Sequence, residues 1–176
     1  MLFRSECAKE IRLKSNFPPE RVKKIVLRLD VAADKVCNIP NPTSGLEAKF
    51  SLRQTVAMAL TGVNTASLEA YSAAITQEPR IKALRDKVDI DFKTDWPHAQ
   101  AEMAIQLDDG TMLEARHDSG IPWTDVAKQR QALETKFDGL VTPVLGAAGA
   151  TRLHDAIDRI DTLADVGELA RASAKA

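Results

Sequence analysis

The chain has 176 residues, with 24 basic and 25 acidic side chains and a formal net charge of -1. A chain of this length is expected to form one domain that buries about 70% of its unfolded surface, so it needs no metal or disulfide to fold. The balanced charge, without a long run of either sign, argues against a nucleic-acid partner and an acidic membrane surface.

The cysteines and the distribution of apolar residues set the expected compartment. Cys7 and Cys37 are the only cysteines and lie in no metal-binding spacing, which indicates reduced thiols. The N-terminal residues show no long apolar signal region, and no window approaches about 18 consecutive apolar residues, the length of a membrane-spanning helix. A cytoplasmic location without a membrane partner is therefore expected.

The first elements are a helix and a strand. A helix is expected from Ser5 to Ser15, because Ala8 and Ile11 lie on one side of it and prolines follow. A turn at Pro19 leads to a strand at 23–31. Its inward residues are expected to be Ile25, Leu27, Leu29 and Val31, which alternate with more polar positions.

The stretch 41–62 changes abruptly from a polar loop into the most apolar helix of the sequence. Pro40, Pro42 and Gly45 are expected to keep the approach non-helical, and Ser51 is the natural N-cap of a buried helix that begins at Leu52. Gly62 is expected to stop this helix. The apolar residues at roughly helical spacing are Leu46, Phe50, Val56, Ala57 and Leu60.

The start of this central helix is the candidate binding site. Lys49 and Arg53 flank it, so free backbone N–H groups, the positive end of the helix dipole and two cations occur within one turn. A carboxylate or phosphate suits such a site. We expect the binding residues to be Lys49, Ser51, Arg53 and Gln54. The alternative is that both cations stand in solvent, as at most helix starts.

Two short helices and three further strands are expected next. The helices are 65–74 and one that begins at Pro79, and the second strand contains Val88, Ile90 and Phe92. Ile105 and Leu107 belong to a third strand, which Asp109-Gly110 joins to a fourth at 111–116, because this dipeptide tolerates the positive φ angles of a hairpin turn.

The last third is expected to be helical. Thr124 or Asp125 can cap a helix, and Pro143 with Gly146 and Gly149 separates it from a second one. The tail, 170–176, has nothing large to bury and is expected to fray. The fold class is therefore α+β, a single domain over 1–176 with a mainly antiparallel sheet of about four strands and helices packed on it.

The histidines offer little visible chemistry. None of His98, His117 and His154 lies at ligand spacing from another histidine or a cysteine, so no metal or other cofactor is expected. His117 beside Asp118 is a candidate proton-transfer pair, but adjacent residues on an extended chain point opposite ways, which favours a solvated loop. His98, in a loop, and His154, on a polar helix side, are expected to be surface groups.

Six segments in chain order resemble the MmgE/PrpD family. The segments are NFPPERVKKIVLRLD, GLEAKFSL, EPRIKALRDKVDIDF, LDDGTMLEARHDSGIP, ETKFDGLVTPVLG and TLADVGEL. They extend from about Phe17 to Leu169, almost the whole chain. The resemblance is to the C-terminal α+β domain of that family.

The resemblance implies an enzyme that acts on small di- or tricarboxylic acids. Members include 2-methylcitrate dehydratase, cis-aconitate decarboxylase and iminodisuccinate epimerase, which transfer protons beside a carboxylate without a metal. In such enzymes a larger helical domain comes first and supplies an aspartate, a histidine and a lysine, and the α+β domain closes over the site as a lid. By this resemblance, Met1 lies about where the lid begins.

Two positions of this chain depart from the family pattern. Many members open the first helix of the lid with a histidine and follow the Phe-Ser-Leu-x motif with a tyrosine. Here those places hold Leu2, or a residue near it, and Gln54. Neither side chain can transfer a proton near neutral pH. The retained Phe50 and Ser51 set geometry more than chemistry.

Two functions stay open. In one, the chain is the lid half of a lyase or epimerase, inactive alone, with a separate helical domain as partner. In the other, it is a stand-alone remnant or interaction module that keeps a weak carboxylate site. The sequence also leaves homo-oligomer formation open.

Overall fold

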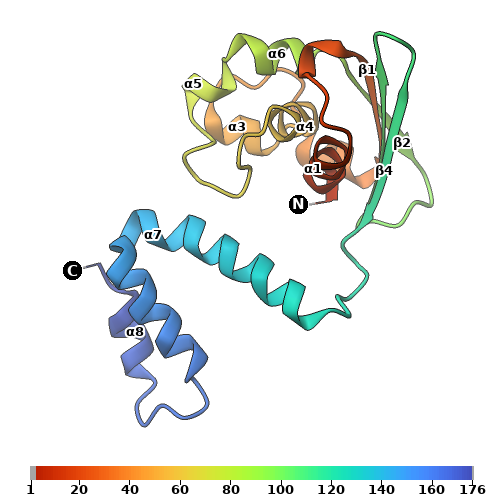
Figure 1. Cartoon of the computed structure of the whole chain (residues 1–176). Coiled ribbons are helices and arrows are strands. Elements are labelled where there is room, and N and C mark those ends of the chain that lie inside the picture. The colour runs from red at the N-terminus through yellow and green to blue at the C-terminus, as the bar shows by residue number, and fades with distance from the viewer. Residues whose placement is uncertain (1–2, 176) are drawn as a thin grey trace. The chain divides into compact units, whose positions relative to one another are not determined.

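A four-stranded sheet forms where the sequence alternates apolar and polar residues. In this computed structural model, which describes residues 3–175, the strands are β1 (Val22–Asp30), β2 (Val88–Lys93), β3 (Gln100–Leu107) and β4 (Met112–Asp118). Figure 1 shows the sheet nearly edge-on. The order of its strands is β2-β1-β3-β4. The α+β class and the number of strands are confirmed.

The sheet is mixed. β3 pairs antiparallel with β1 and with β4, but β1 and β2 run parallel, with Ile25 opposite Val88. The expected mainly antiparallel sheet therefore needs this correction. Its physical reason is the long helical connection between β1 and β2, because a crossover of that length can bring the second strand back in the same direction.

The chain divides into two compact units, residues 1–122 and 123–176, because most contacts between residues fall within one unit or the other. The sheet and the first helices belong to the first unit, and the last helices form the second. The single domain over 1–176 stays a prediction. Within the described part of the chain, no helix has the length and apolar character that crossing a membrane requires.

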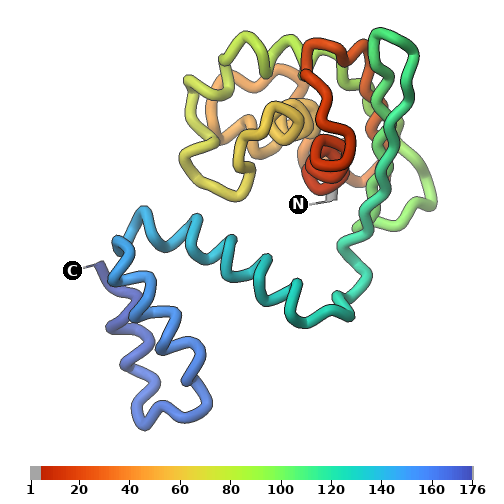
Figure 2. Tube along the Cα trace, viewed as in Figure 1, coloured from red at the N-terminus to blue at the C-terminus, as the bar shows by residue number. Residues whose placement is uncertain are grey.

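In the first unit, helices pack on one face of the sheet, as Figure 2 shows along the chain trace. Helix α1 (Phe3–Ser15) contacts α4 (Leu52–Leu60), β3 and β4. The core lies between these helices and the strands. Its largest fully buried side chains include Ile25, Leu27, Leu29, Leu52, Met58, Leu60, Ile81, Met103 and Ile105.

The inward alternation of β1 ends earlier than expected. Ile25, Leu27 and Leu29 are fully buried, whereas Val31 is 44% exposed. The strand ends at Asp30, and Val31 is already the N-cap of α2 (Ala32–Cys37). The expectation for Val31 is wrong because a helix begins before the strand pattern runs out.

The approach to the central helix contains a helix that was not expected. α3 (Gly45–Lys49) starts with a capping box, in which Ser44 accepts from the backbone N–H of Glu47 while the Glu47 side chain accepts from that of Ser44. Because α3 is separate from α4, its apolar residues do not continue the buried face of α4. Leu46 is 68% and Phe50 is 38% exposed.

The region after α4 also differs from expectation. The helix predicted at 65–74 is wrong, since only α5 (Ala73–Thr76) is helical there. Asn64 and Ser67 accept from backbone N–H groups two residues ahead, and such local bonds compete with helix formation. The helix that Pro79 opens is confirmed as α6 (Pro79–Arg85).

The two remaining turns of the first unit follow their local signals. A short 3-10 helix, η1 (Pro19–Arg21), leads into β1. The hairpin between β3 and β4 has Gly110 at φ 87°, as the Asp-Gly signal predicts.

The second unit consists of α7 (Val126–Asp158) and α8 (Gly167–Ser173). Asp125 caps α7 by accepting from the N–H of Lys128. Gly146, with φ 71° and ψ 168°, interrupts the helix, so the predicted division into two helices is confirmed at that residue. Helix α8 extends to Ser173, and fraying of the tail, 170–176, stays a prediction.

Candidate functional site

The central helix α4 begins where the sequence predicts. The Ser51 hydroxyl accepts a hydrogen bond from the backbone N–H of Gln54 at 3.2 Å, and both side chains are fully buried. This bond satisfies one of the free N–H groups of the first turn. The Ser51 side chain therefore acts as the cap of α4.

A short backbone pairing fixes the chain before this cap. Asn38 forms an isolated antiparallel bridge with Ser51, and the N–H of Ile39 donates to the Phe50 carbonyl at 3.0 Å. The segment after α2 is thereby held beside the first turn of α4. Asn38 consequently lies next to the candidate site, although it is distant from it in sequence.

Arg53 is held by two neutral acceptors. Its Nε donates to the carbonyl of Val88 at 3.2 Å, and its Nη1 donates to Oδ1 of Asn38 at 2.6 Å. Within residues 3–175, no carboxylate lies within ion-pair distance of this guanidinium. Two of its five N–H donors are used, and its positive charge is not neutralised by a direct partner.

Lys49, the last residue of α3, has a different environment. Its ammonium lies 5.2 Å from the centroid of the Tyr71 ring, in the range of a cation–π interaction. The two cations beside the start of α4 thus contact different neighbours, Tyr71 for Lys49 and the Asn38 and Val88 acceptors for Arg53.

Gln54 belongs to the first turn of α4 and is fully buried. Its Nε2 donates to the carbonyl of Thr76 at 3.2 Å, while its Oε1 is buried without a hydrogen-bond partner among the described residues. An unsatisfied buried acceptor of this kind costs about 1–3 kcal/mol. A side-chain amide does not titrate near neutral pH, so the buried Gln54 can orient its neighbours at the helix start but cannot move a proton.

No sequence pattern predicts the neighbours of Arg53. Val88 contributes a backbone carbonyl, which no side-chain pattern reveals. Asn38 is oriented by Asp34, whose Oδ1 accepts from the Asn38 Nδ2 at 2.6 Å. The four-residue spacing of Asp34 and Asn38 is readable in the sequence, but the approach of Arg53 depends on tertiary structure.

The histidines lie in three separate places. His98 is in the loop before β3 and 83% of its side chain is exposed, as expected, and its Nδ1 lies 2.9 Å from Oδ1 of Asp30. Asp30 has a lowered pKa, because the N–H of Ala32 and then His98 bond to its carboxylate. Its carboxylate thereby ties this loop to the start of α2.

The expected solvated loop at His117 is wrong. His117 and Asp118 are the last residues of β4, half-buried and paired with β3, because the strand continues two residues beyond its predicted end. As neighbours on a strand they point to opposite faces of the sheet. The other expected departure, at Leu2, lies outside the described residues.

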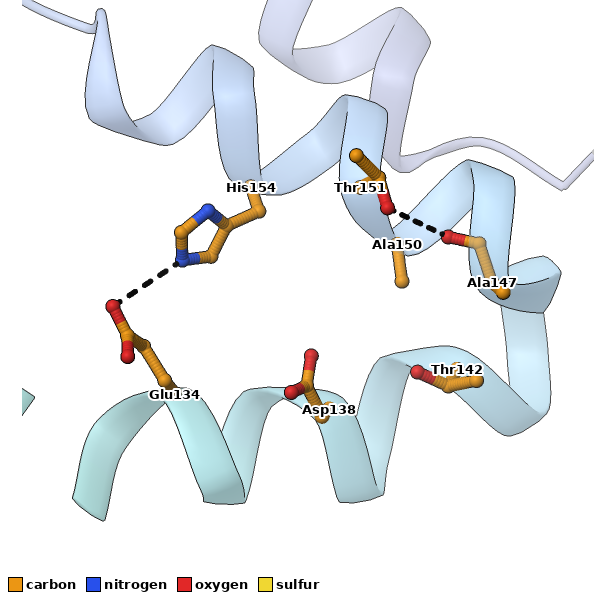
Figure 3. Close-up of a pocket in the computed structure, with 7 residues that line it drawn as sticks. All are labelled: Glu134, Asp138, Thr142, Ala147, Ala150, Thr151 and His154. Carbon is orange, nitrogen blue, oxygen red and sulfur yellow. Dashed lines mark hydrogen bonds and ion pairs between the residues drawn. The ribbon is translucent and has the colours of Figure 1, made fainter. Parts of the chain in front are cut away.

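His154 lines a polar groove between the two halves of α7, which encloses about 560 Å³ (Figure 3). Its Nε2 lies 3.8 Å from Glu134 and its Nδ1 lies 3.5 Å from Asp158. Arg130 bonds to both of these carboxylates, so the ion pairs join the helix halves across the break at Gly146. Among residues 3–175, no group of three or more histidine, cysteine, aspartate or glutamate residues has the arrangement of a metal site.

Comparison with known proteins identifies the family. No curated protein matches the chain. The family model described as MmgE/PrpD C-terminal domain matches residues 5–162, which include the whole sheet and all of α4 and α7. The chain therefore belongs to the MmgE/PrpD family, whose C-terminal domain these residues form.

Proposed function

We propose that this chain is the lid half of a metal-independent lyase (a dehydratase or decarboxylase) or of an epimerase that acts on small di- or tricarboxylic acids. The observation that carries the proposal is the match of residues 5–162 to the C-terminal domain of the MmgE/PrpD family. Six segments of the chain resemble enzymes of that family, in which this domain closes over the substrate.

The environment of Arg53 supports an anionic substrate. A guanidinium that two neutral acceptors hold in place keeps its charge and three N–H donors for a ligand. Lys49 adds a second cation within one turn of the helix start, and the buried Ser51 and Gln54 fix the local backbone through the hydrogen bond between them. These four residues form the proposed carboxylate site.

The affinity of the chain alone should be low. A partly exposed set of charge-assisted contacts worth about 4 kcal/mol corresponds to a dissociation constant of about 1 mM. Screening at about 0.15 M ionic strength, with a Debye length of about 8 Å, should weaken binding further.

Citrate titrations followed by NMR test the site at low salt. Wild type should show shifts at the start of α4, and Arg53→Ala should lose them. The matched control is Arg80→Ala, which removes a guanidinium of the same unit whose Nε pairs with Glu20 at 3.0 Å. Equal affinities for wild type and Arg53→Ala would show that the helix start is ordinary solvated surface.

Turnover should require a helical partner domain. The exposed apolar side chains of Leu46 and Phe50 on and after α3 give such a domain a surface to contact. The decisive assay mixes this chain with a helical N-terminal domain of the MmgE/PrpD family and follows deuterium incorporation from solvent beside the carboxylates of citrate, 2-methylcitrate, cis-aconitate and iminodisuccinate. Exchange only in the mixture supports the lid proposal, whereas turnover by the highly purified chain alone contradicts inactivity in isolation.

The second candidate is a non-catalytic module that retains a weak carboxylate site. Gln54 favours it, because a buried amide stands where many resembling enzymes have a tyrosine. In that case citrate binds at the start of α4, but no helical domain restores proton exchange. Restored exchange in the mixture excludes this alternative.

A further inference from the structure

Asn38 occupies a bridging position between an acidic and a basic side chain. Its Nδ2 donates to Oδ1 of Asp34 at 2.6 Å, and its Oδ1 accepts from Nη1 of Arg53 at 2.6 Å. An ionised carboxylate only accepts hydrogen bonds, so Asp34 fixes which end of the amide is turned toward it. The amide oxygen is thereby presented to Arg53.

This arrangement is unlike that of most other arginines in the chain. Direct carboxylate partners within 4 Å occur at Arg21, Arg28, Arg80, Arg85, Arg116, Arg130 and Arg171. At Arg53 a neutral amide stands between the guanidinium and the nearest bonded carboxylate, that of Asp34. The side chain is held in place without the neutralisation that a direct ion pair would bring.

The remaining donors of Arg53 define the geometry of a ligand. Nε is bonded to the Val88 carbonyl and one N–H of Nη1 is bonded to Asn38. One N–H of Nη1 and both of Nη2 remain, and guanidinium N–H groups of this kind are strong donors to a carboxylate. Fixing the guanidinium in advance also reduces the conformational entropy lost on binding.

We infer that Asn38 is a positioning residue for the carboxylate site, because it holds Arg53 through a neutral acceptor and leaves the guanidinium charge for the substrate. The inference rests on the proposed function and deepens it. A carboxylate at position 38 would pair directly with Arg53 and neutralise its charge, so affinity for carboxylates depends on the neutral amide.

The test is citrate titration of Asn38→Asp at pH 7.5 and low salt, followed by NMR at the start of α4. The dissociation constant should rise at least tenfold above wild type. The matched control, Asn64→Asp, makes the same chemical change at an exposed turn of the same unit, where the side chain accepts only from the N–H of Ala66. Its dissociation constant should change less than twofold.

A double variant separates direct pairing from net charge. Asp34→Asn with Asn38→Asp restores the wild-type net charge but keeps a carboxylate against Arg53, so its affinity should stay at least tenfold below wild type. Wild-type affinity in the double variant would show that position 38 acts only through long-range charge, which overturns the inference.

A measurement on the wild-type chain does not depend on whether a variant folds. Citrate should shift the side-chain NH₂ signals of Asn38, because its partner Arg53 is engaged, and should leave those of Asn64 unchanged. Shifts at Arg53 with unchanged Asn38 signals, or wild-type affinity in Asn38→Asp, would overturn the positioning role while the carboxylate site stands. Absence of citrate binding by wild type would instead overturn the carboxylate site and, with it, this inference.

Discussion

Gly45 is the position where adding one methyl group should destabilise the first unit most directly. An ideal Cβ at Gly45 would lie 1.7 Å from the carbonyl oxygen and 2.4 Å from the carbonyl carbon of Tyr71. These are backbone atoms, so no side-chain rotation relieves the clash. Either α3 or the segment before α5 must move, and movement of α3 disturbs the capping box of Ser44 and Glu47.

The magnitude follows from two opposing terms. Alanine is favoured over glycine in a helix by about 1 kcal/mol, whereas overpacking that forces backbone shifts costs about 1–3 kcal/mol or more. With a clash this deep, Gly45→Ala should lower the free energy of unfolding by about 2 kcal/mol. For a chain of this size, that corresponds to a fall in Tm of about 4–8 °C.

Gly139→Ala is the matched control, because Gly139 lies within α7 and an added Cβ meets nothing within 4 Å. It should gain about 0.5–1 kcal/mol from helix propensity alone. Urea denaturation followed by backbone amide NMR signals measures each unit separately, with α4 reporting the first and α7 the second. A free energy of unfolding for Gly45→Ala within 0.5 kcal/mol of wild type, or changes of the same sign in both variants, would refute the reasoning.

Three further outcomes are expected. Leu52→Ala should lower the free energy of unfolding by about 2–5 kcal/mol because Leu52 is fully buried, whereas Leu68→Ala at a 61% exposed site should change it by less than about 0.5 kcal/mol in the same urea titration. The backbone N–H of Thr111 and further bonds lower the pKa of Asp109 to about 2, so the contribution of this carboxylate to stability is present above pH 4 and is lost as the pH falls toward 2. Thermal melts of Asp109→Asn should therefore show a weaker dependence of Tm on pH between 4 and 2 than wild type. An unchanged pH profile would contradict the assignment. Burial raises the pKa of the Cys7 thiol to about 12. In a Cys37→Ala background, iodoacetamide at pH 8 should therefore label Cys7 only as fast as the chain opens. Labelling at the rate of a solvent-exposed thiol would refute the burial of Cys7.

Local sequence signals predicted the elements that local chemistry controls. Ser51 caps α4, Gly110 takes positive φ in the hairpin, and Gly146 interrupts the last long helix. The same kind of local signal also favours α3, because Ser44 and Glu47 have the spacing of a capping box. The prolines and glycine around it favour an irregular loop instead, which is why no helix is expected there.

Tertiary contacts account for what the sequence did not predict. The parallel pairing of β1 with β2 depends on how the intervening helices pack, which no strand pattern contains. The acceptors of Arg53 come from Asn38 and from the Val88 carbonyl, which lie 15 and 35 residues away in the sequence. The candidate cations could be named from the sequence, but not the partners that hold them.

The place of β1 in the sheet has a consequence for how the first unit assembles. Both neighbours of β1 come later in the chain, β2 after all of α2 to α6 and β3 after that. The hairpin of β3 and β4 can close locally, whereas β1 must wait for partners that are distant in sequence. Until then its apolar residues and both rows of backbone hydrogen-bonding groups stay unpaired. A product truncated before Val88 would present β1 with two open edges, so premature termination should yield aggregates rather than a smaller folded domain.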